Sequence, residues 1–179
     1  MRHSRTDTRT AYHEAGHCLI SLHLGVPVTS IGIERKASWN GYPYIQKKGW
    51  IRHGRGVTAS LENCILILLA GPMAEKMCPY GIGRSADFYL TSLEDMTQVY
   101  ETVEEVGFTG ACRGRYMRQC RSRVEKGLRY HWKQVEALAN ALLIRKRLTG
   151  KQAEKIAGEV WEKEKGKPLL TAHGKKKEG

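Results

Sequence analysis

Two histidines and a glutamate near the start of the chain have the types and spacing that metal-assisted hydrolysis requires. They lie in His13-Glu14-Ala15-Gly16-His17, an H-E-x-x-H pattern. In an α-helix, residues four apart lie within about 40° of one another around the axis, so both imidazoles can reach one metal ion. Glu14 lies between them and can accept a proton from an activated water. The pattern predicts a zinc site that cleaves peptide bonds; the plainer alternative is a helix with two surface histidines.

A catalytic zinc site generally takes three protein ligands, so a third residue is needed. His23 stands where the last histidine of H-E-x-x-H-x-x-G-x-x-H would stand. That longer motif needs a glycine to turn the chain back toward the metal, and Ile20 occupies its place here. If the helix continues, His23 lies about 240° round the axis from His17. We therefore expect His23 to face away from the metal, near the end of the helix.

Carboxylates in a later predicted helix are better candidates for the third ligand. Their spacing does not choose among Asp87, Glu94, Asp95, Glu101, Glu104 and Glu105. Asp87 differs by position, because it falls in the first turn after a glycine-rich loop, where a short carboxylate can project inward from a rigid start. The alternative for Asp87 is an acid that stabilises the helix dipole.

Gly16 lies inside the predicted metal-binding helix. A glycine costs a helix interior about 1 kcal/mol relative to alanine. We therefore expect another segment to pack closely against the helix behind its metal-binding face.

The apolar periodicity and the turn and capping signals of the sequence predict a mainly α fold (α+β) that positions these residues. It has about five helices and a small β-sheet or hairpin after the metal-binding helix. The first helix should end near Leu24, before Gly25 and Pro27. Alternation of apolar residues predicts a strand over Val28–Ile33, and Asn40-Gly41 predicts a turn after it. Four further helices are expected, over 58–77, 86–106 and 116–146 and from the capping box at 149–152 to about 163. The first of these should kink or break at Pro72, and the third should be interrupted near Gly127.

Length and composition predict one domain over residues 1–165, followed by a basic tail, 166–179, with too little apolar surface to pack. The chain has 179 residues and a formal net charge of +12. Its five cysteines are odd in number and scattered, which favours a reducing cytoplasm and excludes a cysteine zinc knuckle. The longest apolar run, 64–73, is far shorter than the roughly 20 residues that span a bilayer, so we expect no membrane insertion.

A basic segment over 113–129 carries seven Arg or Lys residues. Its ordinary explanation is a solvated helix face, and the alternative is a surface for nucleic acid or an acidic partner.

Several stretches together resemble the peptidase domain of the FtsH-type AAA+ proteases. Residues 11–17 resemble the family's zinc-binding helix, 28–33 its following strand, 68–75 its second core helix, and 135–143 with 148–150 its last helices. Ser85-Ala86-Asp87 matches the place where the family's aspartate ligand opens a helix. The resemblance implies Zn²⁺ bound by His13, His17 and Asp87, with Glu14 as the general base.

The chain departs from that family in having neither a G-x-x-x-x-G-K-[ST] loop nor a spanning segment. We therefore predict an ATP-independent zinc metalloendopeptidase, cytoplasmic, acting on unfolded or flexible proteins and peptides. A separate ATPase chain or an oligomeric partner could feed it. The alternative is a catalytically silent metal-binding module for regulation or interaction. If Val28–Ile33 forms a sheet edge, an extended substrate could add to it as a further strand.

Overall fold

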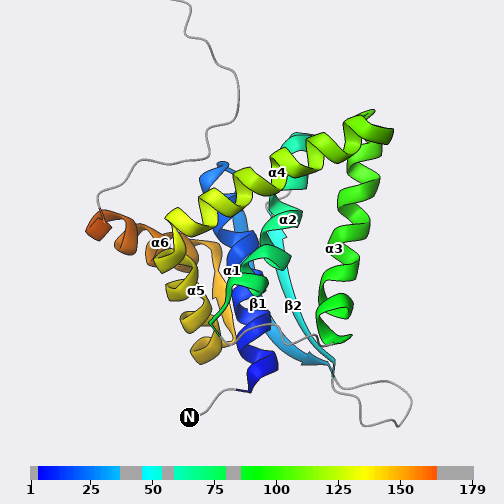
Figure 1. Ribbon diagram of the computed structural model, residues 1–179. Coiled ribbons are helices and arrows are strands. Elements are labelled where there is room, and N and C mark those ends of the chain that lie inside the picture. The colour runs from blue at the N-terminus through cyan, green and yellow to red at the C-terminus, as the bar shows by residue number, and fades with distance from the viewer. Residues whose placement is uncertain (1–3, 37–45, 54–58, 80–85, 165–179) are drawn as a thin grey trace, which may run out of the picture.

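The computed structural model describes residues 4–36, 46–53, 59–79 and 86–164 (Figure 1). These residues form six helices and a small sheet, which confirms the predicted mainly α fold with a small β element. In chain order the elements are α1 (Arg5–His23), β1 (Val28–Lys36), β2 (Gln46–His53), α2 (Leu61–Met77), α3 (Ala86–Glu105), α4 (Gly110–Tyr130), α5 (Trp132–Arg145), β3 (Arg147–Thr149) and α6 (Gly150–Glu164).

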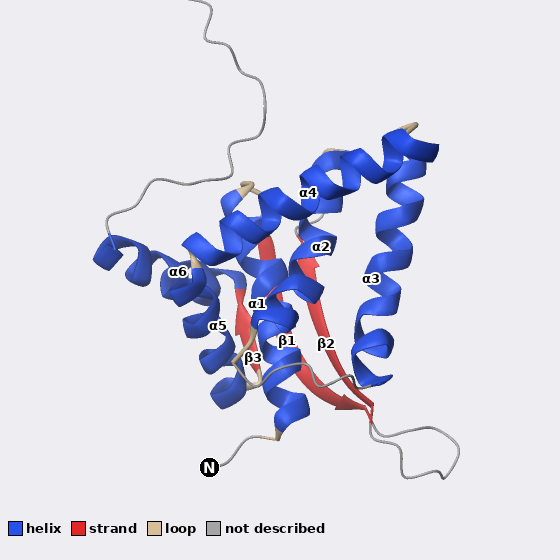
Figure 2. Ribbon diagram, viewed as in Figure 1, coloured by secondary structure: helices blue, strands red, loops and turns tan. Residues whose placement is uncertain are grey.

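Helix α1 lies at the centre of the fold. It begins after Ser4, whose Oγ accepts a hydrogen bond from the Asp7 backbone amide at 3.1 Å. It ends at His23, and Gly25 follows with a φ of 69° that favours glycine. The helix contacts α2 and α5 and also strands β1 and β2. Figure 2 shows it lying across the sheet. Residues on different faces of α1 therefore meet different elements.

The sheet has three antiparallel strands in the order β2-β1-β3. Ile31 of β1 pairs with Ile51 of β2 on one side and with Leu148 of β3 on the other. The hypothesis of substrate addition to Val28–Ile33 is therefore wrong, because it requires a sheet edge and this segment lies in the central strand. Its second neighbour, β3, has only three residues between two helices and gives no alternating pattern long enough to predict.

Helix α2 is apolar on most sides and largely buried. It begins after Ser60, whose Oγ accepts a hydrogen bond from the Asn63 amide at 3.2 Å. Pro72 does not break it, since the helix runs unbroken from Leu61 to Met77. Proline removes one intrahelical donor, and the dense packing around α2 maintains the helix despite that loss.

The long basic helix predicted over 116–146 is two helices, which is why there are six rather than five. Helix α4 begins at Gly110 and passes through Gly127, which is buried in its interior. The interruption falls instead at His131, where φ is −104° and ψ is 23°. Tertiary packing at Gly127 outweighs the weak helix propensity of glycine.

Helix α6 begins with the predicted capping box. The Thr149 amide donates to Gln152 Oε1 at 2.9 Å, and the Gln152 amide donates to Thr149 Oγ1 at 3.3 Å. The turn predicted at Asn40-Gly41 and the tail 166–179 lie outside the described residues. None of the helices in the described part of the chain is both long and apolar enough to cross a bilayer.

Candidate metal centre

His13 and His17 bring their imidazoles together on one face of α1. Their Nε2 atoms are 3.0 Å apart, and both side chains are buried. The four-residue spacing in a helix accounts for this approach.

Helix α3 brings a carboxylate to the same point. Asp95 Oδ2 lies 2.9 Å from His13 Nε2 and 3.5 Å from His17 Nε2. A tetrahedral zinc ion with ligand bonds of about 2.0–2.1 Å separates its ligand atoms by about 3.3 Å. The three atoms therefore have the mutual spacing of three ligands around one such ion.

A hydrogen bond at Nδ1 of each histidine orients its ring so that Nε2 faces the cluster. His17 Nδ1 lies 2.7 Å from the Ile67 carbonyl oxygen, which can only accept a hydrogen bond. His17 Nδ1 therefore carries the proton, and its Nε2 presents a lone pair. His13 Nδ1 donates in the same way to Glu75 Oε2 at 3.0 Å. The Nε2 atoms of both imidazoles and a carboxylate oxygen thus converge on one point, and this is a set of atoms that could hold a metal ion.

Glu75 is held in place as a carboxylate although only 1% of it is exposed. Arg9, one helical turn before His13, donates to Glu75 Oε1 from Nε at 2.9 Å and from Nη2 at 2.5 Å. Burial alone would raise the pKa of Glu75, but the hydrogen bonds and positive charges of His13 and Arg9 outweigh it and keep this pKa below its usual value. Arg9 and Glu75 therefore orient the His13 ring.

The charges around His13 make it strongly basic in the metal-free protein. Burial lowers the pKa of His13, but hydrogen bonds to Asp95 and Glu75 and the charge of Glu14 raise it to about 10. Burial would raise the pKa of Asp95, yet its contacts with His13 and His17 hold it well below the usual range. A proton on His13 therefore balances the neighbouring carboxylates in the metal-free protein, and a metal ion bound here would have to displace it.

This competition predicts opposite pH dependences for the two forms of the protein. The raised His13 pKa stabilises the metal-free fold fully below pH 6.5, and this stabilisation is lost as pH rises toward 10. Zinc binding improves as the same proton leaves. Between pH 6.5 and 9, the melting temperature should fall in EDTA and should hold or rise in the zinc-loaded protein after excess metal is removed. If the melting temperatures of the two forms change with pH in the same way, this account of His13 is wrong.

Glu14 is buried beside the cluster without being one of its three ligand atoms. Its charge acts on the neighbouring His13 ring. Glu14 is therefore a candidate for proton exchange at this site, with coordination left to the other three side chains.

Two glycines allow α1 and α2 to approach closely beside the histidines, on the side that α2 covers. A Cβ at Gly16 would lie 2.6 Å from both the Ala70 carbonyl oxygen and the Ala74 Cβ. The predicted close approach at Gly16 is thus confirmed. A Cβ at Gly71 would overlap the ring of His17 itself. Glycine at 71 is therefore required for the His17 ring to occupy its position.

We expect Gly71→Ala to displace the His17 imidazole and to weaken zinc binding about tenfold or more, as changes next to metal ligands commonly do. Gly158→Ala in α6 is the matched control, because a Cβ there meets no atom within 4 Å. Competition with a chromogenic zinc chelator measures both affinities. Unchanged zinc affinity in Gly71→Ala would show that the His17 position does not matter for binding.

The other sequence candidates fall in different places. His23 faces α5, with Nε2 3.4 Å from Gln134 Oε1 and its ring against His131, as expected for a histidine that is not a ligand. Asp87 lies in the first turn of α3, but its side chain is outside the described residues. Positions 87 and 95 are separated by eight residues, or about 12 Å along a helix axis.

Sequence reasoning missed Glu75 and Arg9. Each had a signal that was readable in advance. Glu75 lies inside the apolar part of α2, away from Glu62 in the first turn, and a buried charge needs a partner. Arg9 precedes His13 by four residues, as His13 precedes His17, so all three lie along one face of α1.

A comparison with protein-family models found no match, and a comparison with curated proteins found none either.

Proposed function

We propose that the chain is an ATP-independent zinc metalloendopeptidase whose metal is held by His13, His17 and Asp95. The observation that supports this most directly is the convergence of the two Nε2 atoms and Asp95 Oδ2 within ligand distance of one ion. Nitrogen and carboxylate donors in this number are typical of a catalytic zinc site that keeps a position open. The resemblance to FtsH-type peptidases, stated from the sequence, is part of the same proposal.

The residues of the chain divide the work of peptide hydrolysis among them. Zinc bound there would supply Lewis acidity that polarises the scissile carbonyl and acidifies the attacking water. Glu14 accepts the proton of that water and returns it to the nitrogen of the leaving amine, so that one carboxylate acts first as base and then as acid. Glu75 and the Ile67 carbonyl keep the two imidazoles in the tautomer that presents Nε2.

Substrates would be extended segments, and strand β2 supports this choice. It pairs with β1 on one side, and no strand of the described residues pairs with its other side. β2 ends at His53, whose Nε2 lies 2.9 Å from Ser21 Oγ, one helical turn after His17. An extended peptide added along β2 would thus run beside the metal ligands, with its backbone held independently of sequence.

The function is tested by zinc-dependent cleavage of an unfolded protein. We expect the zinc-loaded chain to cleave casein without ATP, the EDTA-treated chain to be inactive, and one equivalent of zinc to restore cleavage. Mass spectrometry of the peptide products identifies the cleavage sites, which excludes cleavage by a contaminating protease of fixed specificity. If the zinc-loaded chain cleaves neither casein nor a peptide library, a metal-binding module without turnover is the better description.

A further inference from the structure

A cavity of about 900 Å³ opens between α2, α3 and α4. Helices α3 and α4 are joined near residues 106–109 and diverge from there (Figure 1). Each packs on α2 more extensively than on the other, so their facing sides border a groove whose floor is α2.

The floor and one wall of this groove are apolar. Met73 and Met77 contribute from α2, and Leu93 and Met96 contribute from α3. Leu93 is 62% exposed, which is unusual for a leucine beside a hollow. Methionine side chains adapt their shape to apolar partners, and they are common on surfaces that bind helices. Ser92 also lines the cavity, and its buried Oγ has no hydrogen-bond partner within the described part of the chain.

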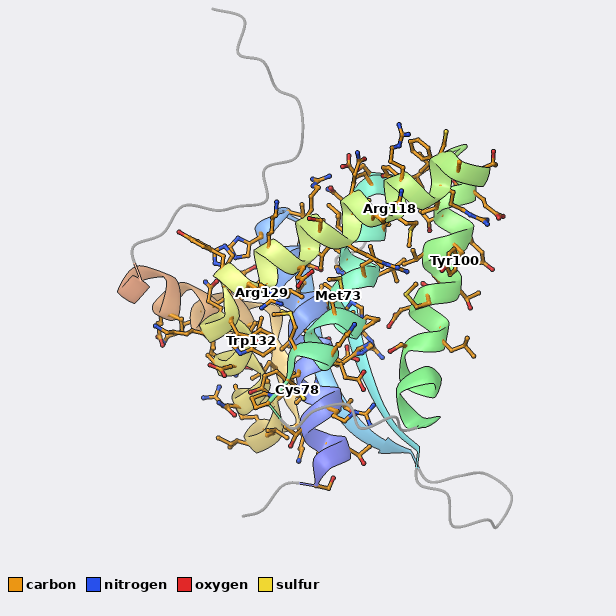
Figure 3. All side chains as sticks on the ribbon, in the orientation of Figure 1. Met73, Cys78, Tyr100, Arg118, Arg129 and Trp132 are labelled. Carbon is orange, nitrogen blue, oxygen red and sulfur yellow. The ribbon has the colours of Figure 1, made fainter. Side chains whose placement is uncertain are left out.

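The opposite wall is basic. Arg121 and Arg129 line the cavity from α4 and are exposed, and Lys76 lines it from α2. One carboxylate, Glu125, lies among them and pairs with Arg129 at 2.8 Å. Figure 3 shows Met73, Arg129 and Trp132 gathered where α2, α4 and the start of α5 meet. Cations thus remain in excess at the wall that faces the apolar floor.

Helix α2 lies between this groove and the two histidines of the metal centre. Gly71 and Glu75 of α2 face the histidines of α1. Met73 and Lys76 line the groove, and they lie about 200° and 140° round the helix from Gly71. A ligand in the groove would therefore lie on the side of α2 that faces away from His13 and His17, whereas Asp95 of α3 directly precedes the groove-lining Met96.

We propose that this groove binds an acidic amphipathic helix from another protein. Its apolar side would lie on the methionines and Leu93, and its carboxylates would face Arg121 and Arg129. Helix-in-groove binding needs such an apolar floor with a charged rim. The tail of this chain fits poorly because residues 165–179 contain five lysines and one glutamate, and a second copy carries the same net charge of +12. The proposal is independent of the proposed peptidase activity.

The test uses the full chain carrying Glu14→Gln, which keeps a peptide probe intact, at 150 mM salt. The probe is a fluorescent peptide of about 18 residues, five helical turns, with leucine at i, i+3, i+4 and i+7 spacing and glutamate on its other face. A scrambled peptide of the same composition and a peptide with lysine for glutamate are the controls. We expect the acidic amphipathic peptide to bind at least tenfold more tightly than either. Failure of all three to bind, or equal binding of the scrambled peptide, would overturn the proposal.

Two sets of variants locate the binding. Arg121→Glu with Arg129→Glu should weaken binding at least tenfold, and so should Leu93→Glu, whose exposure keeps the fold intact. Arg115→Glu with Lys126→Glu changes the charge of α4 by the same amount at exposed positions that do not line the cavity, and it should bind normally. Equal loss in both pairs would reduce the effect to overall charge and overturn the proposal.

Two further measurements separate this groove from other binding modes. Removal of zinc with EDTA should leave peptide binding unchanged; loss of binding would place the peptide at the metal centre instead and overturn the proposal. Vesicles of 70% phosphatidylcholine and 30% phosphatidylserine should not bind in a way that depends on Leu93 and Arg121. If they do while the peptide fails, a membrane surface is the partner and the proposal is wrong.

Discussion

Glu14→Gln should bind zinc as the native chain does and should lose about 100-fold or more of its proteolytic rate. The amide has nearly the same shape as the carboxylate but cannot accept a proton from the attacking water, and positioned general bases typically contribute 10²–10⁴-fold. Glu14 is not one of the three atoms that meet at the metal point, so removing its charge should leave coordination in place. The rate is measured on casein, and the zinc content by atomic absorption.

The same variant needs a control that removes a neighbouring carboxylate with no expected role. Glu94→Gln serves, because Glu94 is exposed on α3 and lies outside the metal cluster. It should keep both zinc and activity. If Glu14→Gln retains native activity, the base is another group; if it loses zinc as well, Glu14 acts through the metal site's structure.

The part of the site that could be predicted is the part that lies within one helix. His13 and His17 meet because a helix returns to the same face every four residues, and that spacing is written in the sequence. Gly16 could likewise be read as a point of close packing because its helix propensity is poor and only a tertiary contact compensates for it. Both inferences rest on local geometry.

Contacts between residues of different helices were harder to predict, and the third proposed ligand illustrates the reason. The six carboxylates of α3 have similar local settings, and the one that faces α1 depends on how α3 rotates against its neighbours. The spacing of residues in α3 indicates which side of the helix faces inward. Asp95, Val99 and Val103 follow one another at intervals of four residues, and the two valines are fully buried. A carboxylate in line with the buried face of an amphipathic helix is a stronger candidate than one chosen for its place near the helix start. The three-residue strand β3 and the central position of β1 had no comparable signal, because long-range pairing determines them.

Asp95→Ala should weaken zinc binding by at least tenfold and by more than any other substitution in α3. It removes the oxygen proposed as the third ligand, which lies 2.9 Å from His13 Nε2 and 3.5 Å from His17 Nε2. Asp87→Ala is the decisive comparison, because the resemblance to FtsH-type peptidases assigns the ligand to position 87 and the geometry favours position 95.

The two positions are about 12 Å apart along α3, so only one of them can supply the aspartate of a single-ion site. Chelator competition on both variants therefore gives opposite outcomes for the two assignments. Loss of affinity in Asp95→Ala with native affinity in Asp87→Ala would favour the ligand set of His13, His17 and Asp95. The reverse result would return the ligand to Asp87 and would require the start of α3 to approach α1 when zinc binds. Glu94→Ala, one residue from Asp95 and exposed, should leave zinc affinity unchanged in either case, which separates loss of a ligand from a general loss of negative charge on this helix.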